Sequence, residues 1–286
     1  MVKIRAPAKV NLYLRVLGKR SDGYHLIDTV MVPVDLYDEL ELTRPRTEKA
    51  GQTGLTVVCD HPMVPPGKEN LAYKAASLLL RTKEFHDPVH IHIKKKIPVG
   101  GGLGGGSSDA AATLIGLNRL LRLGVDRSEM FSLAASLGAD VPFFVGGRPA
   151  RAGGIGEQLK PMSDLPHLRM VILYPGFGVS TRWVYQNLAL TLTKAVENTN
   201  LKFSLSDPEE LGRFLVNDLE RVAVPRYPRI SILKERLVQE GAAGVLMAGS
   251  GSSVFGIFSA AREAQKAFRR LHKEAGVQAY LVRSLS

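Results

Sequence analysis

Apolar and polar residues alternate in three early stretches of the chain, and each stretch predicts β-structure. Apolar residues occupy every second position from Val10 to Val16, which matches the two-residue period of a strand. Residues 27–42 contain apolar runs interrupted at 35–39, so they predict two strands joined by a turn. Residues 89–93 alternate again, directly before a glycine-rich segment.

Apolar residues spaced three to four positions apart predict three helices in the same half of the chain. The first covers residues 71–80, after a loop rich in proline and glycine. The second begins near Ser107. The third begins at Asp126, whose side chain can cap it, and ends at Gly138.

Strands and helices follow one another in an irregular order in the rest of the chain. The pattern predicts, in order, strand 168–174, a helix from 180 onward, helix 228–240, strands 244–247 and 254–258, helix 260–276 and strand 279–282. No low-complexity linker or internal repeat separates the halves. We therefore predict two closely packed domains, residues 1–160 and 161–286, with a soft boundary near Lys160.

Composition narrows the class of protein. The 286 residues can bury a large core, and no stretch approaches the roughly 20 apolar residues of a membrane helix. Cys59 is the only cysteine, which excludes an intrachain disulfide and favours a reducing compartment. Charges and a proline interrupt the first residues, so they do not resemble a signal peptide. We expect a cytoplasmic protein with no membrane partner.

The net charge of +11 favours anionic partners, either nucleic acid or phosphorylated small molecules. The longest lysine run covers only residues 94–96, and the other basic residues are scattered among acidic ones. No basic tail or basic stripe with interleaved aromatics is present. We therefore predict a phosphate-rich small substrate rather than nucleic acid.

The clearest chemical feature is the segment 98–109, which reads Pro-Val-Gly-Gly-Gly-Leu-Gly-Gly-Gly-Ser-Ser-Asp. Its glycines allow the backbone to curl around a ligand with several N–H groups pointing inward. A helix follows directly, and its N-terminus favours an anion. Ser107 and Ser108 add hydroxyl donors. The segment thus predicts a phosphate-binding loop.

Standard nucleotide motifs do not explain this loop. Gly106 stands where the Walker pattern requires lysine, and a formal GxGxxG match carries no weight in a run so rich in glycine. The alternative interpretation is a floppy surface loop. The order of strand, glycine loop and small-residue helix favours phosphate binding over that alternative.

The loop resembles the nucleotide loop of the GHMP kinases, a superfamily that includes galactokinase, homoserine kinase and mevalonate kinase. A narrower likeness within the superfamily covers residues 7–14, 20–25, 98–112, 138–144 and 247–255. The likeness to the superfamily as a whole rests on three motifs in the family's order, at residues 7–12, 98–109 and 248–253. It implies an α+β two-domain GHMP kinase fold with a ribosomal-protein-like N-terminal domain and a ferredoxin-like C-terminal domain. It also implies an active site between the domains.

The resemblance implies ATP-dependent phosphorylation of a hydroxyl group. Asp140 stands where the family has its catalytic aspartate, which accepts the hydroxyl proton, and Lys9 stands where it has its catalytic lysine. Mg²⁺ is expected to arrive with ATP and to be held by phosphates and water rather than by protein ligands. The residues matched to ATP binding are Asn70, Lys95, Pro98, Gly100, Gly101, Gly102, Gly104, Gly105, Gly106, Ser107 and Ser108.

Within the superfamily the likeness is strongest to members whose small acceptor carries a cytidine diphosphate group and belongs to isoprenoid synthesis. Tyr24 and His25 are the pair that those members use to recognise cytosine. Tyr185, with Thr181 nearby, matches a second aromatic wall, although Trp183 stands only two residues away. Asn11 would bond the polyol.

Simpler interpretations of these residues stay open at this point. Asp140 could stabilise a turn, Lys9 could be a solvated strand residue, and Asn70 could be an ordinary helix cap. The rival functions are a GHMP kinase for another acceptor and a nucleic-acid-binding module. His90 and His92 share a strand face, but no nearby acid or cysteine completes a metal site. We expect a monomer or a weak homodimer.

Overall fold

The computed structural model describes residues 1–45, 54–163, 165–188, 210, 212 and 214–285. The chain forms two compact units that interleave along the sequence. The first unit comprises residues 1–8, 36–99 and 104–147, and the second comprises residues 9–35, 100–103 and 148–286. Strands β1 (Val2–Lys19) and β2 (His25–Thr43) contribute residues to both units. The predicted domain boundary at Lys160 stays a prediction.

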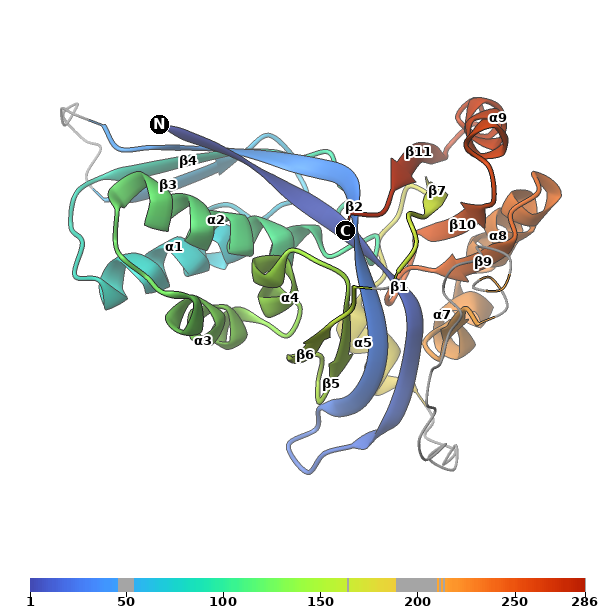
Figure 1. Cartoon of the computed structure of the whole chain (residues 1–286), viewed down its shortest axis with the longest axis horizontal. Coiled ribbons are helices and arrows are strands. Elements are labelled where there is room, and N and C mark those ends of the chain that lie inside the picture. Colours follow the sequence, from blue (N-terminus) through green and yellow to red (C-terminus); the bar gives the residue numbers. More distant parts are fainter. Residues whose placement is uncertain (46–53, 164, 189–209, 211, 213, 286) are drawn as a thin grey trace. The chain divides into compact units, whose positions relative to one another are not determined.

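The first unit contains a sheet covered by helices. Part of β2 pairs antiparallel with β4, which pairs in parallel with β3. α1 and α2 lie beside β3 and β4 and pack against each other, and α3 and α4 pack against these two helices (Figure 1). The elements are β3 (Leu55–Cys59), a 3₁₀ turn (Gly67–Glu69), α1 (Leu71–Thr82), β4 (Val89–Lys94), α2 (Gly105–Leu121), α3 (Arg127–Leu137) and α4 (Val141–Gly146).

Small residues let α2 approach the sheet closely. Ala110, Ala111 and Leu114 are buried on its inner face. A Cβ at Gly116 would stand 2.9 Å from Cδ1 of Leu42 on β2, so a larger residue there would require the Leu42 side chain to move. The first unit thereby fixes the helix that follows the glycine-rich segment.

The predicted turn at residues 35–39 is wrong, because β2 continues unbroken from His25 to Thr43. Leu36, Asp38, Leu40 and Leu42 are all buried on one face of the strand. Asp38 can occupy a buried strand position because its carboxylate accepts hydrogen bonds from the backbone N–H groups of Lys96 and Ile97.

The second unit contains an antiparallel sheet with the strand order β11-β7-β10-β9. One or more helices connect β7 to β9, and one helix connects β10 to β11, which is the ferredoxin-like βαββαβ pattern. The elements are β7 (Arg169–Tyr174), α5 (Thr181–Gln186), α7 (Glu220–Arg226), α8 (Arg229–Gln239), β9 (Gly244–Met247), β10 (Val254–Phe258), α9 (Ala261–Leu271) and β11 (Gln278–Arg283).

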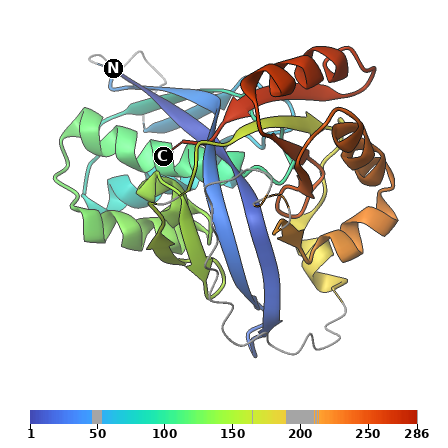
Figure 2. The ribbon, with the colours of Figure 1, turned by 45° about the vertical axis from the view of Figure 1, so that its right-hand side comes forward.

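Shorter strands complete the second unit around the end of the β1–β2 hairpin. β8 (Val216–Asn217) pairs in parallel with β1. β5 (Ala150–Gly153) pairs with β2 and with β6 (Gln158–Pro161), and Figure 2 shows both strands beside the hairpin. The sequence did not predict these strands, because two to four residues contain too few alternations to show a period.

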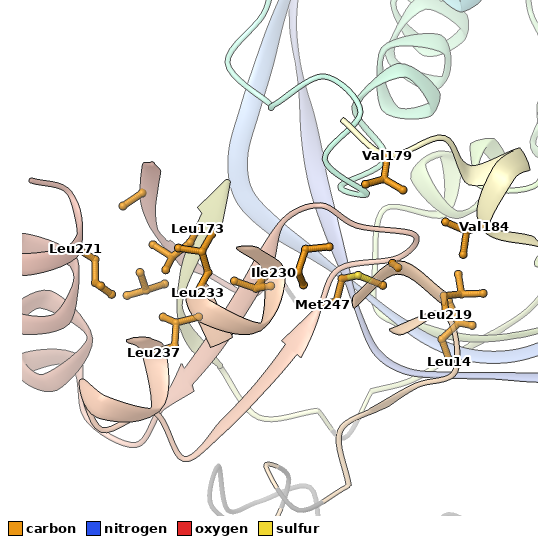
Figure 3. Packing of buried hydrophobic residues seen from close by; sticks show 14 of the residues in the cluster. Leu14, Leu173, Val179, Val184, Leu219, Ile230, Leu233, Leu237, Met247 and Leu271 are labelled. Atoms are coloured by element: carbon orange, nitrogen blue, oxygen red, sulfur yellow. The ribbon is translucent and has the colours of Figure 1, made fainter. Parts of the chain in front are cut away.

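Apolar side chains from several segments of the second unit form one core (Figure 3). Leu233 and Leu237 of α8 face Leu173 of β7, and Leu271 of α9 belongs to the same cluster. Burial of each such leucine stabilises the fold by about 1.5–3 kcal/mol. None of the described helices is both long and apolar enough to cross a bilayer.

Candidate functional site

The glycine-rich segment divides between the two units, with residues 100–103 in the second and Gly104 onward in the first. Gly104 precedes α2 and has φ +73°, a left-handed conformation that strongly favours glycine. The N–H groups of the first turn of a helix lack intrahelical acceptors and carry the positive end of the dipole. In the first unit, Gly104 to Ser107 supply such N–H groups, whereas the N–H of Ser108 donates to the carbonyl of Gly104 at 2.9 Å. Gly105 to Ser108 therefore form a candidate anion-binding turn.

A buried cluster of three charges lies beneath this turn. The ammonium of Lys95 pairs with Asp38 of β2 and, at 2.8 Å, with Asp109 of α2. The Lys95 side chain is only 4% exposed, and its Nζ lies 3.1 Å from where a Cβ on Gly105 would stand. The cluster thus ties the start of α2 to the sheet. Lys95 is predicted to bind ATP, and its ammonium lies next to Gly105, the first residue of this turn.

Burial dominates the electrostatics of this cluster. It raises the pKa of Asp109 to about 7, against the attraction of the Lys95 ammonium and with added repulsion from Asp38. Burial also opposes the charge of Lys95, but the two carboxylates outweigh it and raise the pKa of Lys95. Oδ1 of Asp109 and Oγ of Ser108 are buried without a hydrogen-bond partner among the described residues.

This electrostatic arrangement predicts a pH-dependent stability. The unfolded chain ionises Asp109 near its ordinary pKa of 3.8, whereas the folded chain holds the proton up to about pH 7. Stability contributed by this group therefore falls as the pH rises between those values. Asp109→Asn removes the penalty and preserves the bond from Lys95, since the amide nitrogen can replace the unpartnered Oδ1.

Urea unfolding of both proteins tests this expectation at about pH 4.5 and about pH 8. The free energy of unfolding of the variant should increase relative to that of the parent as the pH rises. Asp126→Asn, at a cap that Asn serves equally well, is the control and should show no such change. A difference between Asp109→Asn and parent that stays constant with pH would contradict the prediction.

Asn70 and Asp140 also belong to the first unit. Asn70 caps α1, and its Oδ1 accepts the N–H of Ala72 at 2.9 Å. Asp140 precedes α4, where Val141 N–H donates to the carbonyl of Gly138 and Pro142 occupies the first turn. The predicted constrained turn at Asp140 is confirmed, and it is the start of a short helix.

The second unit holds a buried polar chain on the β1–β2 hairpin. Lys9 Nζ donates to Oδ1 of Asn11 at 2.7 Å, and Nδ2 of Asn11 donates to Oγ1 of Thr29 at 2.8 Å. Lys9 is 5% exposed, so the interpretation of a solvated strand lysine is wrong. Lys9 and Asn11 share a strand face, as predicted. Thr29 is a member of this chain that the sequence did not single out.

Residues 100–103 pack against a second glycine loop, residues 248–253. Ser253 N–H donates to the carbonyl of Gly101, and Val179 N–H donates to that of Gly100. A Cβ on Gly102 would lie 2.0 Å from the carbonyl oxygen of Ala248. The interpretation of a floppy surface loop is therefore wrong for this part of the segment.

Two rings predicted to hold a base meet in the second unit. The rings of His25 and Tyr185 lie 5.1 Å apart at an interplanar angle of 33°. Trp183 instead lies edge-on to Tyr227 at 6.0 Å, so the structure favours Tyr185 as the partner of His25. Tyr24 is 60% exposed beside this pair.

Further contacts shape the surroundings of the ring pair. Thr181, at the start of α5, shares a 2.8 Å hydrogen bond with Ser250 of the second glycine loop. Burial, with a smaller effect of Lys19, lowers the pKa of His25. The imidazole is therefore neutral at pH 7 and offers one donor and one acceptor.

His90 and His92 lie on β4 among paired strands. In the part of the chain that the structure describes, no group of three or more histidine, cysteine or acidic residues could hold a metal ion.

The sequence of the chain matches two protein-family models. Residues 70–148 match the GHMP kinases N terminal domain, and residues 194–278 match the GHMP kinases C terminal model. The two matches cover both glycine loops and most of the ferredoxin-like unit. They define the chain as a GHMP kinase with an α+β two-domain fold, and kinases of this class use ATP as phosphoryl donor.

Individual relatives give a narrower assignment. A protein of Citrifermentans bemidjiense, named 4-diphosphocytidyl-2-C-methyl-D-erythritol kinase, is 45% identical over 284 residues, which cover 99% of each chain. A protein of the same name from Syntrophus aciditrophicus is 43% identical over 100% of each chain. A crystal structure of 4-(cytidine 5'-diphospho)-2C-methyl-D-erythritol kinase aligns over 100% of both chains with a TM-score of 0.81 and 38% identity. The chain belongs to this family of GHMP kinases.

Proposed function

We propose that this protein transfers the γ-phosphoryl group of ATP to the 2-hydroxyl of 4-diphosphocytidyl-2-C-methyl-D-erythritol, in the non-mevalonate route to isoprenoids. The observation that carries the proposal is the pairing of His25 with Tyr185, in a chain whose full-length relatives bear that enzyme's name. A kinase for an acceptor without a base would not need such a pair.

The anion-binding turn supports the assignment of the ATP phosphates to the start of α2. The backbone N–H groups from Gly104 to Ser107 and the positive helix end would contact phosphate oxygens. Lys95, paired with two buried aspartates, would hold the turn in place. Asn70, Pro98 and Gly100 to Gly102 complete the proposed nucleotide site.

Magnesium is proposed to enter with ATP. It would be held by phosphate oxygens and water rather than by a set of protein ligands. Such an ion would offset part of the negative charge of the phosphates.

The phosphoryl transfer itself requires a proton acceptor and compensation of charge. Asp140 would accept the proton as the acceptor oxygen forms its bond to the γ-phosphorus and the bond to the ADP oxygen breaks. The ammonium of Lys9 would stabilise the negative charge that develops during transfer. Asn11 already accepts a bond from Lys9 and would orient the polyol.

Cytosine recognition would rest on the second unit. A neutral His25 can donate to and accept from the base edge, while the ring of Tyr185 stacks on or borders the base. The exposed ring of Tyr24 would cover the base from the hairpin, and Thr181 would bond the substrate from the start of α5.

Three aromatic variants test this recognition. His25→Ala and Tyr185→Ala should each weaken acceptor binding by about 1–3 kcal/mol, or roughly tenfold to a hundredfold, with ATP affinity unchanged. Trp183→Ala is the matched control, because its ring packs against Tyr227 rather than His25. A larger loss for Trp183→Ala than for Tyr185→Ala would contradict the assignment.

ATP turnover on a panel of hydroxyl acceptors, with and without a cytidyl group, tests the function itself. The cytidyl substrate should be used far better than methylerythritol phosphate. Equal use of the two would leave a GHMP kinase for another acceptor. Steep salt-dependent RNA binding without turnover would favour a nucleic-acid-binding protein instead. A cytoplasmic location, supported by the single cysteine, and a monomer or weak homodimer remain part of the proposal.

A further inference from the structure

The side-chain amide of Asn217, at the end of β8, forms hydrogen bonds through both its nitrogen and its oxygen within the second unit. It is 6% exposed, and both hydrogens of its amide are donated, to the carbonyl of Met247 at 2.9 Å and to that of Gly249 at 2.7 Å. Its Oδ1 accepts the N–H of Leu219 at 3.0 Å. A buried side chain with this many bonds to backbone groups fixes the path of the chain around it.

These bonds hold the entrance to the second glycine loop from two sides. The N–H of Met247 donates to Glu220, at the start of α7, while its carbonyl accepts from Asn217. Figure 3 shows Met247 in one group with Leu219 and Leu14. Asn217 accepts the N–H of Leu219 and is the register partner of Leu14 on β1. The residue before the loop is therefore clamped at both its backbone groups.

The clamped loop lies directly against the polar chain of the hairpin. Gly249 has φ +52°, and a Cβ there would stand 2.8 Å from the carbonyl oxygen of Gly102, 3.4 Å from Nζ of Lys9 and 3.5 Å from Oδ1 of Asn11. The loop backbone at Gly249 thus leaves no room for a side chain beside the Lys9–Asn11 hydrogen bond, so a displacement of this loop changes the space around that bond.

We infer that Asn217 is a positioning residue for phosphoryl transfer, which acts through Gly249 on the ammonium of Lys9. The inference rests on the proposed role of Lys9 in that transfer. The Asn217 side chain bonds backbone groups of Met247, Gly249 and Leu219, and its inferred effect is to hold the loop backbone in place beside Lys9 and Asn11. Loss of the clamp releases two buried carbonyls and lets the loop relax away from Lys9.

The neighbouring Asp218 provides a matched control. It is equally buried, at 6%, but its carboxylate bonds Arg15 and the N–H of Val16 on β1 rather than the glycine loop. Asp218→Asn should lower stability without moving Gly249. Asn217→Ala should lower stability and also disturb Lys9.

The experiment compares kcat, KM for both substrates and the melting temperature in the parent, Asn217→Ala and Asp218→Asn. We expect Asn217→Ala to lower kcat about tenfold or more, with each KM within about threefold of the parent, because the lost interaction acts at the transition state. Asp218→Asn should keep kcat within about twofold at a similar fall in melting temperature. In a Lys9→Ala background, measured by single turnover, the further loss from Asn217→Ala should shrink to about twofold or less.

Three results would overturn the inference. One is a fall of kcat that follows the melting temperature equally in both single variants. Another is a raised KM at unchanged kcat, and the third is full additivity with Lys9→Ala. If Asn217→Ala does not fold, Asn217→Ser, which retains one donor, is judged by the same criteria. Failure of both to fold where Asp218→Asn folds assigns Asn217 to stability alone and also overturns it.

Failure of the proposed function gives a different result. A parent protein that does not use the cytidyl substrate refutes the proposed function, whatever Asn217 does. The comparison of variants is then made with the acceptor that the parent does use. If the parent uses no acceptor, the test is the hydrogen exchange of the Gly251 and Ser253 amides, which bond within and beside the loop. An exchange rate that is unchanged in Asn217→Ala overturns the clamp itself.

Discussion

Asp140→Asn should lower kcat by about 10²–10⁴-fold and leave ATP affinity close to that of the parent. The substitution keeps the size of the side chain but removes the group that would accept the hydroxyl proton, together with its negative charge. Asp140 stands at the start of α4, where the backbone bond from Val141 to Gly138 and the ring of Pro142 hold the turn. The variant should therefore fold like the parent.

Steady-state kinetics with the cytidyl substrate, combined with calorimetric titration of ATP, measures this effect. Asp126→Asn is the matched control, since it changes another aspartate at a helix start in the same unit, whose capping role Asn fulfils. The control should keep kcat. Turnover of Asp140→Asn within a few-fold of the parent would remove Asp140 from the proposed proton transfer.

Gly102→Ala should destabilise the protein by about 2–5 kcal/mol and abolish measurable ATP binding. A Cβ at this position would lie 2.0 Å from the carbonyl oxygen of Ala248, which is backbone and cannot swing aside. Gly102 also has φ +77°, where alanine is strained. The two glycine loops would have to separate, and the backbone proposed to contact phosphate would move with them.

Urea unfolding and ATP titration on the same preparation check this expectation. Gly18→Ala is the control, because a Cβ there would meet no atom of the described residues within 4 Å and its φ is not positive. It should match the parent in both measurements. An unchanged ATP affinity in folded Gly102→Ala would show that this stretch does not contribute to nucleotide binding.

Local patterns in the sequence identified the longer elements correctly. The predicted helix at 71–80 is α1, the helix capped by Asp126 is α3, and the strand at 254–258 is β10. Each has enough residues to show a period and a recognisable end. The two-residue strand β8 lacks both, and its geometry comes from pairing with β1, more than 200 residues away in the sequence.

The wrong prediction of a turn at residues 35–39 has a similar physical cause, because the contacts that permit a strand there come from distant residues. An aspartate inside an apolar run indicates a turn, because a buried carboxylate without partners is costly. Asp38 is buried nonetheless, since Lys95, Lys96 and Ile97 supply an ammonium and two N–H groups from a distant strand end. No pattern within the strand itself contains that information.

The sequence alone determined which residue types stand where chemistry requires them. Glycine is needed at Gly102 and Gly104 because their backbones adopt positive φ, and Asn70 is needed where α1 begins without an acceptor for its first N–H groups. These requirements act over a few bonds, so they are visible in the order of residues. They were sufficient to predict the phosphate-binding turn.

Only the tertiary structure decided which distant groups meet. Asn11 bonds Thr29 across 18 residues of chain, and Asn217 bonds Gly249 across 32. Lys95 pairs with Asp38 across 57 residues and with Asp109 across 14. Such contacts depend on the path of the whole backbone, because a hydrogen bond requires two atoms within about 3 Å wherever their residues stand in the sequence. The roles of Asp38 and Asn217 were therefore invisible until the chain was folded.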